Sequence, residues 1–463
     1  MLPPVEFVVL GGGLAGRRLA CDLARLGQQG ILIEYHAFGG ATLNVACLPD
    51  AMLVRAARIA RQIRRGEGCG VGLGDASVDL GRLFAAVGAT VSAARSHDLA
   101  LWPADRVELV IGQGRLIAPD RVEVALADGT FRRIRTRRVF IATGTTVATP
   151  DIPGLSGACP LTPRELFRLT RVPPQLVILG ASFGGMAYAQ AFAALGAEVT
   201  LLDEHERVAR FEDTVFSDAL AQQLRHEGVR LLTSTRVGGV SGLSGEGVTL
   251  SLEQGRQQFE LDASDILLAG ARQPLTRNIG LEAVGVRLDA HGCIVVDETL
   301  KSSVDGIYAL GDVAAYPTPG HAVSDDARVA LSLYGAPLRT TAGRVLPRIA
   351  FVDPEYARIG LSEAEARQAG VAVRVCRLPM HAVTRAWSEG ELGGLMQAVL
   401  AEDDGRILGF AMLGIGAGDV TSAVQVAMHA GLPAAVLAEL PLAHPTAAEA
   451  LNVLFASGSW VRG

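Results

Sequence analysis

The sequence predicts an α/β protein with two Rossmann-like nucleotide-binding units, followed by an α+β domain. Three observations support this prediction. A buried-strand pattern runs into a glycine-rich turn and a helix near the N-terminus, over residues 5–26. The same succession of strand, turn, helix and strand returns over residues 175–202. Beyond about Pro337 the pattern changes to short mixed elements, and 463 residues leave room for about three domains.

The first glycine-rich turn has the spacing that binds a dinucleotide. Its glycines are Gly11, Gly13 and Gly16. The first permits a tight turn, the second lets a pyrophosphate approach the backbone, and the third lets the helix pack closely on the strand. The N-terminus of the following helix supplies amide donors to the phosphates. The next strand ends at Glu34, where an acid can bind a ribose hydroxyl.

The second turn keeps Gly180 and Gly185 but has Ser182 in place of the middle glycine. Asp203 ends the next strand and is the candidate for the ribose-binding acid. An acid at this point favours NAD(H), because it repels a 2′-phosphate, while two nearby arginines leave NADP(H) open. A second unit that keeps the fold and binds nothing is the alternative.

Composition and charge exclude several classes of function. The net charge is −6 with no long basic tract, so we expect neither nucleic acid nor a membrane as a partner. The six cysteines include no CxxC pair, which argues against a metal site and against a secreted disulfide framework. No secretory signal pattern opens the chain, so we expect a cytoplasmic protein. All cysteines except Cys47 are expected to be buried and apolar in role.

Residues 39–51 read Gly-Gly-Ala-Thr-Leu-Asn-Val-Ala-Cys-Leu-Pro-Asp-Ala. This segment resembles the redox-active segment of the pyridine nucleotide–disulfide oxidoreductases, the flavoprotein family of dihydrolipoamide dehydrogenase and mercuric reductase. Family members have two cysteines there, separated by four residues. Here the second is kept as Cys47, the first is replaced by Thr42, and the closing lysine by Ala51. A threonine cannot form a disulfide, so the resemblance predicts the scaffold but not the usual dithiol reaction.

The resemblance covers nearly the whole chain and implies a domain plan. Residues 1–150 would form the first part of an FAD-binding domain, 151–267 an NAD(P)-binding domain, 268–337 a return segment of the FAD domain, and 338–463 a dimerisation domain. The chain would therefore be a homodimer that binds FAD and a nicotinamide nucleotide and acts on a small-molecule substrate. Mercuric reductases also carry a C-terminal cysteine pair, and its absence here disfavours Hg(II) reduction.

The family's motifs also imply individual site residues. Those expected to contact FAD, besides the first glycine-rich turn and Glu34, are Gly40, Thr42, Gly114, Thr143, Gly144 and Asp312. His444 and Glu449 match a motif whose histidine is a catalytic base acting across the dimer interface, with the glutamate orienting it. A glutamate that pairs with the redox-segment lysine in the family is Ala187 here, so both charged partners are absent together.

Three hypotheses for the function stay open. In the first, NAD(P)H reduces the flavin, and Cys47 cycles through a sulfenate, persulfide or mixed disulfide with a small thiol or sulfur substrate. Its thiolate is expected to be stabilised at a helix start, beside an oxidised flavin and near His444. In the second, reduced FAD passes electrons to a quinone, a metal ion or a nucleotide without the thiol. In the third, the chain is a non-redox flavin-binding regulatory protein. An ordinary disulfide reductase would need Cys69 to replace the missing cysteine.

Overall fold

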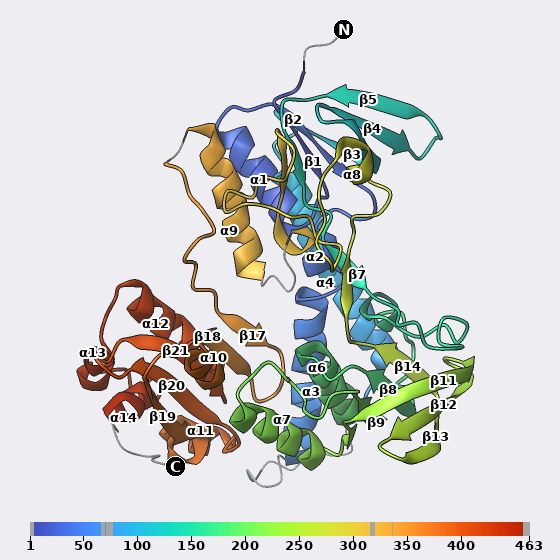
Figure 1. Ribbon diagram of the computed structural model, residues 1–463. Helices are drawn as coiled ribbons and strands as arrows, with labels where there is room; N and C mark the ends of the chain where they lie inside the picture. The colour runs from blue at the N-terminus through green and yellow to red at the C-terminus, as the bar shows by residue number, and fades with distance from the viewer. Residues whose placement is uncertain (1–3, 66–69, 71–76, 315–319, 336, 457–463) are drawn as a thin grey trace. The chain divides into compact units, whose positions relative to one another are not determined.

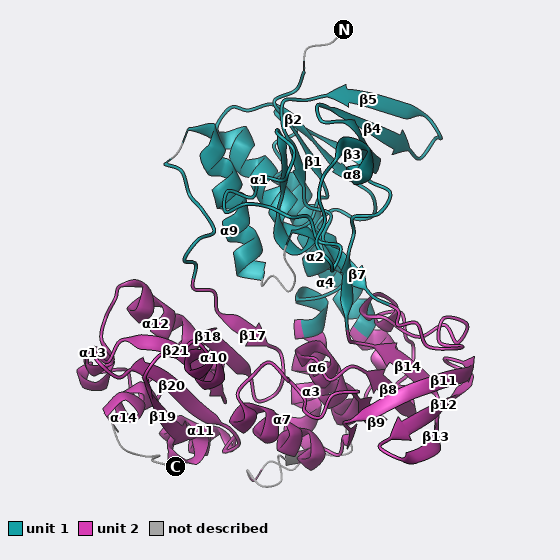
Figure 2. Ribbon diagram, in the orientation of Figure 1, with its two compact units in different colours: residues 1–50, 84–148, 271–344 teal, residues 51–83, 149–270, 345–463 magenta. Residues whose placement is uncertain are grey.

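The computed structural model describes residues 4–65, 70, 77–314, 320–335 and 337–456, so Cys69 and the C-terminal residues lie outside the described residues. The chain forms two compact units, coloured separately in Figure 2. Unit 1 contains residues 1–50, 84–148 and 271–344, and unit 2 contains residues 51–83, 149–270 and 345–463. Helices α3 (Leu48–Arg65) and α4 (Leu80–Ala100) run from one unit into the other.

Unit 1 is built on a seven-stranded sheet in the order β16-β6-β1-β2-β3-β4-β5, of which β1 to β5 are labelled in Figure 1. Its strands are β1 (Phe7–Leu10), β2 (Gly30–Glu34), β3 (Val107–Ala118), β4 (Arg121–Leu126), β5 (Phe131–Arg135), β6 (Val139–Ile141) and β16 (Ile307–Ala309). Parallel pairing joins β16, β6, β1, β2 and β3, and antiparallel pairing joins β3, β4 and β5. The order reverses at β1, because β2 lies on one side of it and β6 on the other. In open parallel sheets such a point is where ligands bind.

Apolar helix faces cover this sheet. Helices α1 and α9 lie side by side (Figure 1), and their apolar residues pack with Phe7, Val9 and Phe140 in one core. The other elements of unit 1 are α1 (Leu14–Arg25), α2 (Gly40–Asn44), α8 (Leu281–Val284), η2 (Gly311–Val313), α9 (Gly320–Leu331), η3 (Ser332–Tyr334) and the strand pair β7 (Thr145–Val147) and β15 (Arg272–Pro274). The continuous Val, Ile and Leu runs of β1 and β2 are buried throughout, as parallel strands covered on both faces require.

The nucleotide-binding part of unit 2 repeats this plan on a smaller scale. A parallel sheet in the order β10-β9-β8-β14 reverses at β8. Its strands are β8 (Gln175–Leu179), β9 (Glu198–Leu202), β10 (Arg230–Leu232) and β14 (Asp265–Leu268), with helices α5 (Pro163–Leu166), α6 (Phe183–Leu195) and α7 (Thr214–His226). An antiparallel sheet of β11 (Thr235–Leu243), β12 (Gly247–Gln254) and β13 (Gln257–Ala263) follows β10 in the chain.

The remainder of unit 2 is an α+β region with a five-stranded sheet in the order β17-β18-β21-β20-β19, antiparallel throughout. Its strands are β17 (Arg348–Ala350), β18 (Tyr356–Gly360), β19 (Val373–Pro379), β20 (Leu395–Ala401) and β21 (Ile407–Leu413). Its helices are α10 (Glu363–Gln368), η4 (Met380–Ala382), α11 (Thr384–Glu389), α12 (Ala417–His429), α13 (Ala434–Glu439) and α14 (Ala450–Ala456). Apolar residues of the sheet and of α12 and α14 form one core.

The α/β fold class is confirmed, with two Rossmann-like sheets in the expected order. One expectation about the cysteines is wrong. Cys293 and Cys376 are buried and Cys21 is half-buried, but Cys159 is exposed because it lies in the loop between β7 and α5. Over the described part of the chain, no helix has the length and apolar composition that crossing a bilayer requires.

Candidate functional site

The first glycine-rich turn lies where the order of the unit 1 sheet reverses. Gly11 follows β1 with φ +109°, and a Cβ there would overlap the carbonyl of Ala142, which follows β6. A Cβ on Gly16 would overlap the carbonyl of Gly11, so α1 packs directly against the turn. Both positions therefore require glycine for close packing, whereas a Cβ added to Gly13 would approach only the Gly40 Cα, at 3.8 Å.

This turn has the features that a dinucleotide needs. Helix α1 begins after Gly13 without a side-chain cap, so its first amide groups are available to phosphate oxygens. Glu34 is buried, and its carboxylate accepts hydrogen bonds from the backbone N–H of Gly12 (2.7 Å) and of His36 (2.7 Å). A Cβ at Gly40 would lie 2.5 Å from the Gly13 Cα, so the redox segment starts beside the turn. These residues fit FAD.

The other predicted FAD residues of the sequence fall at several places in unit 1. Thr42 lies in α2, five residues before Cys47. Thr143 and Gly144 follow β6, and the Thr143 hydroxyl donates to the Leu275 carbonyl (2.8 Å). Gly114 lies in β3, where a Cβ would lie 2.7 Å from the side chain of Leu10. Its surroundings are therefore those of the sheet core.

Asp312 follows β16 in the short helix η2, and its carboxylate accepts a hydrogen bond from the Thr145 hydroxyl (3.1 Å). Arg272 of β15 donates to the hydroxyl and carbonyl oxygens of the same threonine (2.9 and 3.1 Å). Asp326, which the sequence did not single out, accepts a hydrogen bond from the Gly311 N–H (2.8 Å) at the start of η2. Burial raises the pKa of Asp326, while its hydrogen bond with Arg344 lowers it.

Cys47 lies between α2 and α3 with φ +25°, a free thiol in an exposed residue. It immediately precedes α3, as expected. The protein groups around Cys47 within unit 1 act against the expected stabilisation of its thiolate. Partial burial of the sulfur raises the pKa of Cys47, the negative charges of Asp50 and Asp312 raise it further, and Arg272 lowers it. The described residues therefore favour the neutral thiol at neutral pH.

Replacing Asp50 with asparagine is expected to increase the rate at which Cys47 is alkylated. The substitution removes a negative charge that raises the thiol pKa, so more thiolate is present at a given pH. We expect an increase of about two- to fivefold at pH 8, measured as iodoacetamide incorporation at Cys47 by peptide mass mapping. Asp105→Asn, at an exposed acid of the same unit, is the matched control. Equal rates in Asp50→Asn and wild type would contradict the assignment.

The second turn has the same backbone geometry with one chemical difference. Gly180 has φ +106°, and a Cβ there would lie 2.6 Å from the Gly270 Cα at the end of β14. A Cβ on Gly185 would overlap the Gly180 carbonyl, just as a Cβ on Gly16 would overlap the Gly11 carbonyl. Ser182, however, caps α6: its hydroxyl accepts from the Gly185 N–H (3.2 Å) and donates to the Ala269 carbonyl (2.6 Å). This helix N-terminus is therefore already capped by a side chain.

Asp203 holds the second turn as Glu34 holds the first. Its carboxylate accepts from the Ala181 N–H (2.6 Å) and from the His205 N–H (2.9 Å). The His205 ring bridges two charges, with Nδ1 2.7 Å from Asp203 and Nε2 2.7 Å from Arg210. Nδ1 therefore donates to the carboxylate and Nε2 accepts from the guanidinium. Arg207 pairs instead with Asp218.

Ala187 lies on the face of α6 that is turned toward α3. It is buried and lines a cavity of about 10 Å³, together with Val54 and Ala57 of α3. A cavity of this size holds at most one water molecule. Ala51 lies one helical turn before Val54 and is exposed. The two alanines that replace the family's charged pair thus belong to facing helices of unit 2.

His444 and Glu449 are brought together as expected. The His444 Nδ1 lies 2.9 and 3.0 Å from the two carboxylate oxygens of Glu449. Nδ1 therefore carries a proton, which leaves Nε2 as the ring atom that can exchange one. The side chain of His444 is 65% exposed, so Nε2 is accessible to a partner molecule. Cys47 belongs to unit 1 and His444 to unit 2.

Comparison with known proteins identifies the class. The model of the pyridine nucleotide-disulphide oxidoreductase family matches residues 5–331, and that of its dimerisation domain matches residues 346–454. The chain belongs to the pyridine nucleotide–disulfide oxidoreductase family. Members of this family are flavoproteins that use FAD and a nicotinamide nucleotide. The chain therefore combines FAD- and NAD(P)-binding domains with a C-terminal dimerisation domain.

Individual relatives are similar over nearly the full length. The probable pyridine nucleotide-disulfide oxidoreductase RclA of Escherichia coli (strain K12) is 30% identical over 460 residues, which cover 97% of this chain and 98% of that protein. A mercuric reductase of Streptomyces lividans is 32% identical over 464 residues, covering 97% and 95%. The structure of a Cu(II) complex of the HOCl-induced flavoprotein disulfide reductase RclA from Escherichia coli superimposes with a TM-score of 0.88 at 27% identity, covering 98% of this chain and 99% of that one.

Proposed function

We propose that the protein is an FAD-dependent, NAD(P)H-linked homodimeric oxidoreductase that works through the single thiol of Cys47 on a small sulfur substrate. The observation that carries this proposal is the accessible, free thiol of Cys47 at the start of α3, in a redox segment whose other cysteine position is Thr42. The accessible imidazole of His444, held by Glu449, supports it as an acid–base group.

The proposed reaction balances with one thiol. Cys47 attacks a small disulfide RSSR, forms a Cys47–S–S–R mixed disulfide and releases RSH. Two electrons and one proton from NAD(P)H, with one proton from solvent, then give the Cys47 thiol, a second RSH and NAD(P)⁺. With a peroxide or hypochlorous acid, Cys47 becomes a sulfenic acid, and the same two electrons return it to the thiol with release of water. Bound FAD supplies the relay of electrons between nucleotide and sulfur.

The residues of the chain have distinct roles in this proposal. The uncapped start of α1, with Glu34 and Asp312, binds the flavin nucleotide. The turn with Gly180 and Asp203 binds the nicotinamide nucleotide. Across the proposed dimer interface, His444 of the partner subunit takes the proton from Cys47 before attack, which the raised pKa of that thiol makes necessary, and returns it to the departing RS⁻. Glu449 keeps the imidazole oriented.

An anaerobic titration of the purified holoenzyme with NADH and with NADPH tests the proposal. We expect one of them to bleach the oxidised flavin spectrum, and a small disulfide added afterwards to restore it. A flavin that stays oxidised with both nucleotides would contradict the proposal and support a regulatory flavoprotein.

Replacing Asp203 with alanine is expected to raise the KM for NADH about tenfold, because a carboxylate that binds ribose hydroxyls is lost. The KM for NADPH is expected to change less, since the same carboxylate repels its 2′-phosphate and Arg210 remains nearby. Steady-state kinetics with both nucleotides measures the effect. Glu204→Ala, at an exposed neighbour, removes the same charge as a control. An unchanged NADH KM in Asp203→Ala would refute the role of this residue.

A second candidate function has its own supporting observation. Burial and two carboxylates raise the pKa of Cys47, which would suit a cysteine that packs without reacting. Electrons would then pass from the flavin directly to a quinone or metal ion, and a relative whose solved structure is a Cu(II) complex makes copper the first ion to test. A Cys47→Ser protein that reduces a quinone or Cu(II) at the wild-type rate would favour this function.

A further inference from the structure

A buried polar network in unit 2 contacts the turn proposed to bind the nicotinamide nucleotide. Its centre is Tyr356, the first residue of β18, which has no solvent exposure. The ring of Tyr356 stacks on Phe183, with ring centroids 5.1 Å apart and planes 21° apart. Phe183 is the first residue of α6 and follows the capping residue Ser182. The phenol ring of Tyr356 therefore fixes the side chain at the entrance of that helix.

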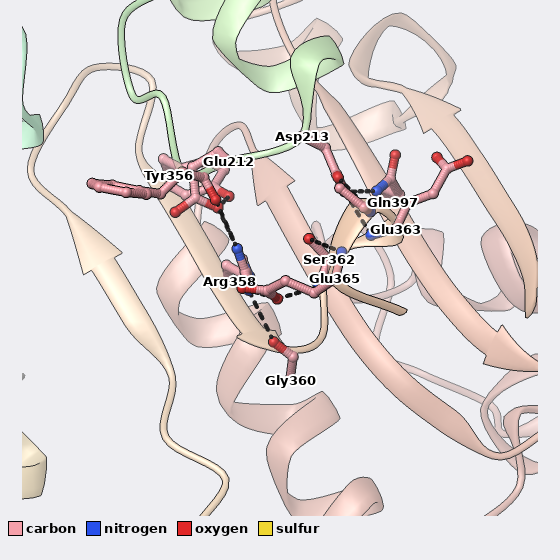
Figure 3. A network of polar contacts seen from close by, with 11 residues as sticks. Glu212, Asp213, Tyr356, Arg358, Gly360, Ser362, Glu363, Glu365 and Gln397 are labelled. Carbon is pink, nitrogen blue, oxygen red and sulfur yellow. Dashed lines mark hydrogen bonds and ion pairs between the residues drawn. The ribbon is translucent and has the colours of Figure 1, made fainter. Parts of the chain in front are cut away.

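The hydroxyl of Tyr356 is itself held by a charged pair. It donates to the Glu212 carboxylate (2.5 Å), which also accepts from the Arg358 guanidinium (3.0 Å). Figure 3 shows the three side chains converging. The side chains of Glu212 and Arg358 are only 2% and 6% exposed, so water does not replace these bonds. Burial, followed by the charge of Glu212, raises the pKa of Tyr356 well above its ordinary value, so the phenol remains a donor.

Glu212 lies in the loop between β9 and α7, nine residues after Asp203. The adjacent residue, Asp213, fixes the far end of that loop. Its carboxylate accepts from the backbone N–H of Glu363 (2.9 Å) and of Ala364 (3.1 Å) at the start of α10, and from the Gln397 side chain (2.6 Å). The two acids thus have different hydrogen-bond partners, and it is Glu212 that bonds to Tyr356, whose ring stacks on Phe183.

We propose that Tyr356 and Glu212 are positioning residues for the nicotinamide nucleotide, because they fix Phe183 and with it the start of α6. The inference rests on the proposed function, in which the Gly180–Gly185 turn binds that nucleotide. A helix entrance that moves loses the alignment of its amide groups with the phosphates, so affinity falls while the chemistry of a bound nucleotide is unchanged. The expected signature is a change in the KM for NAD(P)H with little change in kcat.

Three variants of the full-length holoenzyme test the proposal. Tyr356→Leu removes the ring that stacks on Phe183, and we expect the KM for NAD(P)H to rise about tenfold with kcat within about twofold. Tyr356→Phe keeps the ring and loses only the hydroxyl, so we expect a rise of about threefold. Glu212→Gln keeps an acceptor for both donors and is expected to stay within about twofold. The KM for the oxidising substrate should be unchanged in all three.

Gln397→Met is the matched control. It breaks the bond to Asp213 in the same loop without touching Tyr356, so it lowers the thermal midpoint but should leave the NAD(P)H KM unchanged. The inference is overturned if Tyr356→Leu raises that KM no more than Gln397→Met does, or if all substrates are affected equally. If Tyr356→Leu does not fold, the two other variants still decide. The proposal is upheld if the NAD(P)H KM rises in Tyr356→Phe but not in Glu212→Gln, and is overturned if it does not rise in Tyr356→Phe. Wild-type flavin that neither nucleotide reduces would instead reject the proposed function.

Discussion

Cys47→Ser is expected to reduce turnover of a small disulfide by about a thousandfold or more while FAD remains bound. A serine hydroxyl is nearly the size of the thiol but cannot form a disulfide or a sulfenic acid, so the proposed covalent step is lost. The residues proposed to hold FAD, Gly11, Gly13 and Glu34, are not touched by the substitution. Turnover of the disulfide and the flavin-to-protein absorbance ratio are the two measurements.

Cys159→Ser is the matched control for this variant. Cys159 is also exposed and also has a positive φ of 50°, but it lies in a loop of unit 2. The Cys159→Ser protein should retain wild-type turnover of the disulfide. A Cys47→Ser protein that still turned over the disulfide at a rate similar to wild type would show that the thiol has no chemical role.

Ala187→Glu is expected to lower the free energy of unfolding by about 3 kcal/mol, because it places a carboxylate without a partner in a packed helix interface. Ala187 is 7% exposed, and the adjoining cavity of about 10 Å³ is too small for the new side chain. Adding Ala51→Lys supplies an opposite charge on the facing helix α3. We expect the double variant to recover about 1–2 kcal/mol of the loss, measured by urea unfolding as a double-mutant cycle.

Ala51→Met with Ala187→Glu separates charge from side-chain length in this cycle. Methionine adds a chain of similar length without a charge, so it should give no recovery. Ala51 is exposed, and each single change there should have little effect on stability. Equal recovery with lysine and methionine would mean that the two positions do not interact through charge.

Much of the nucleotide-binding scaffold follows from the sequence because it depends on local patterns. The glycines of both turns, and the acids Glu34 and Asp203, lie within about thirty residues of one another in each unit. Their spacing reflects the length of one strand–helix–strand unit, so it is visible without coordinates. The His444 and Glu449 pair is five residues apart, and its bond could be expected for the same reason.

The remaining features depend on distant contacts that no short pattern records. Glu212 meets Tyr356 across 144 residues, and Ser182 donates to a carbonyl 87 residues away. The influence of Asp312 on Cys47 similarly depends on how the strand β16 returns to the sheet. Thr42 and Ala51 are noticeable in the sequence because they replace residues that the family keeps. Asp50, only three residues after Cys47, replaces no charged family residue, although its carboxylate raises the pKa of the thiol.

The two helix entrances differ in how they begin, since α1 has no side-chain cap and α6 has Ser182. A phosphate arriving at α6 competes with a hydroxyl for the Gly185 N–H, whereas one arriving at α1 meets no such competitor. In the proposed function, the nucleotide bound at α1 should therefore survive dialysis, while the nucleotide bound at α6 should dissociate within each turnover.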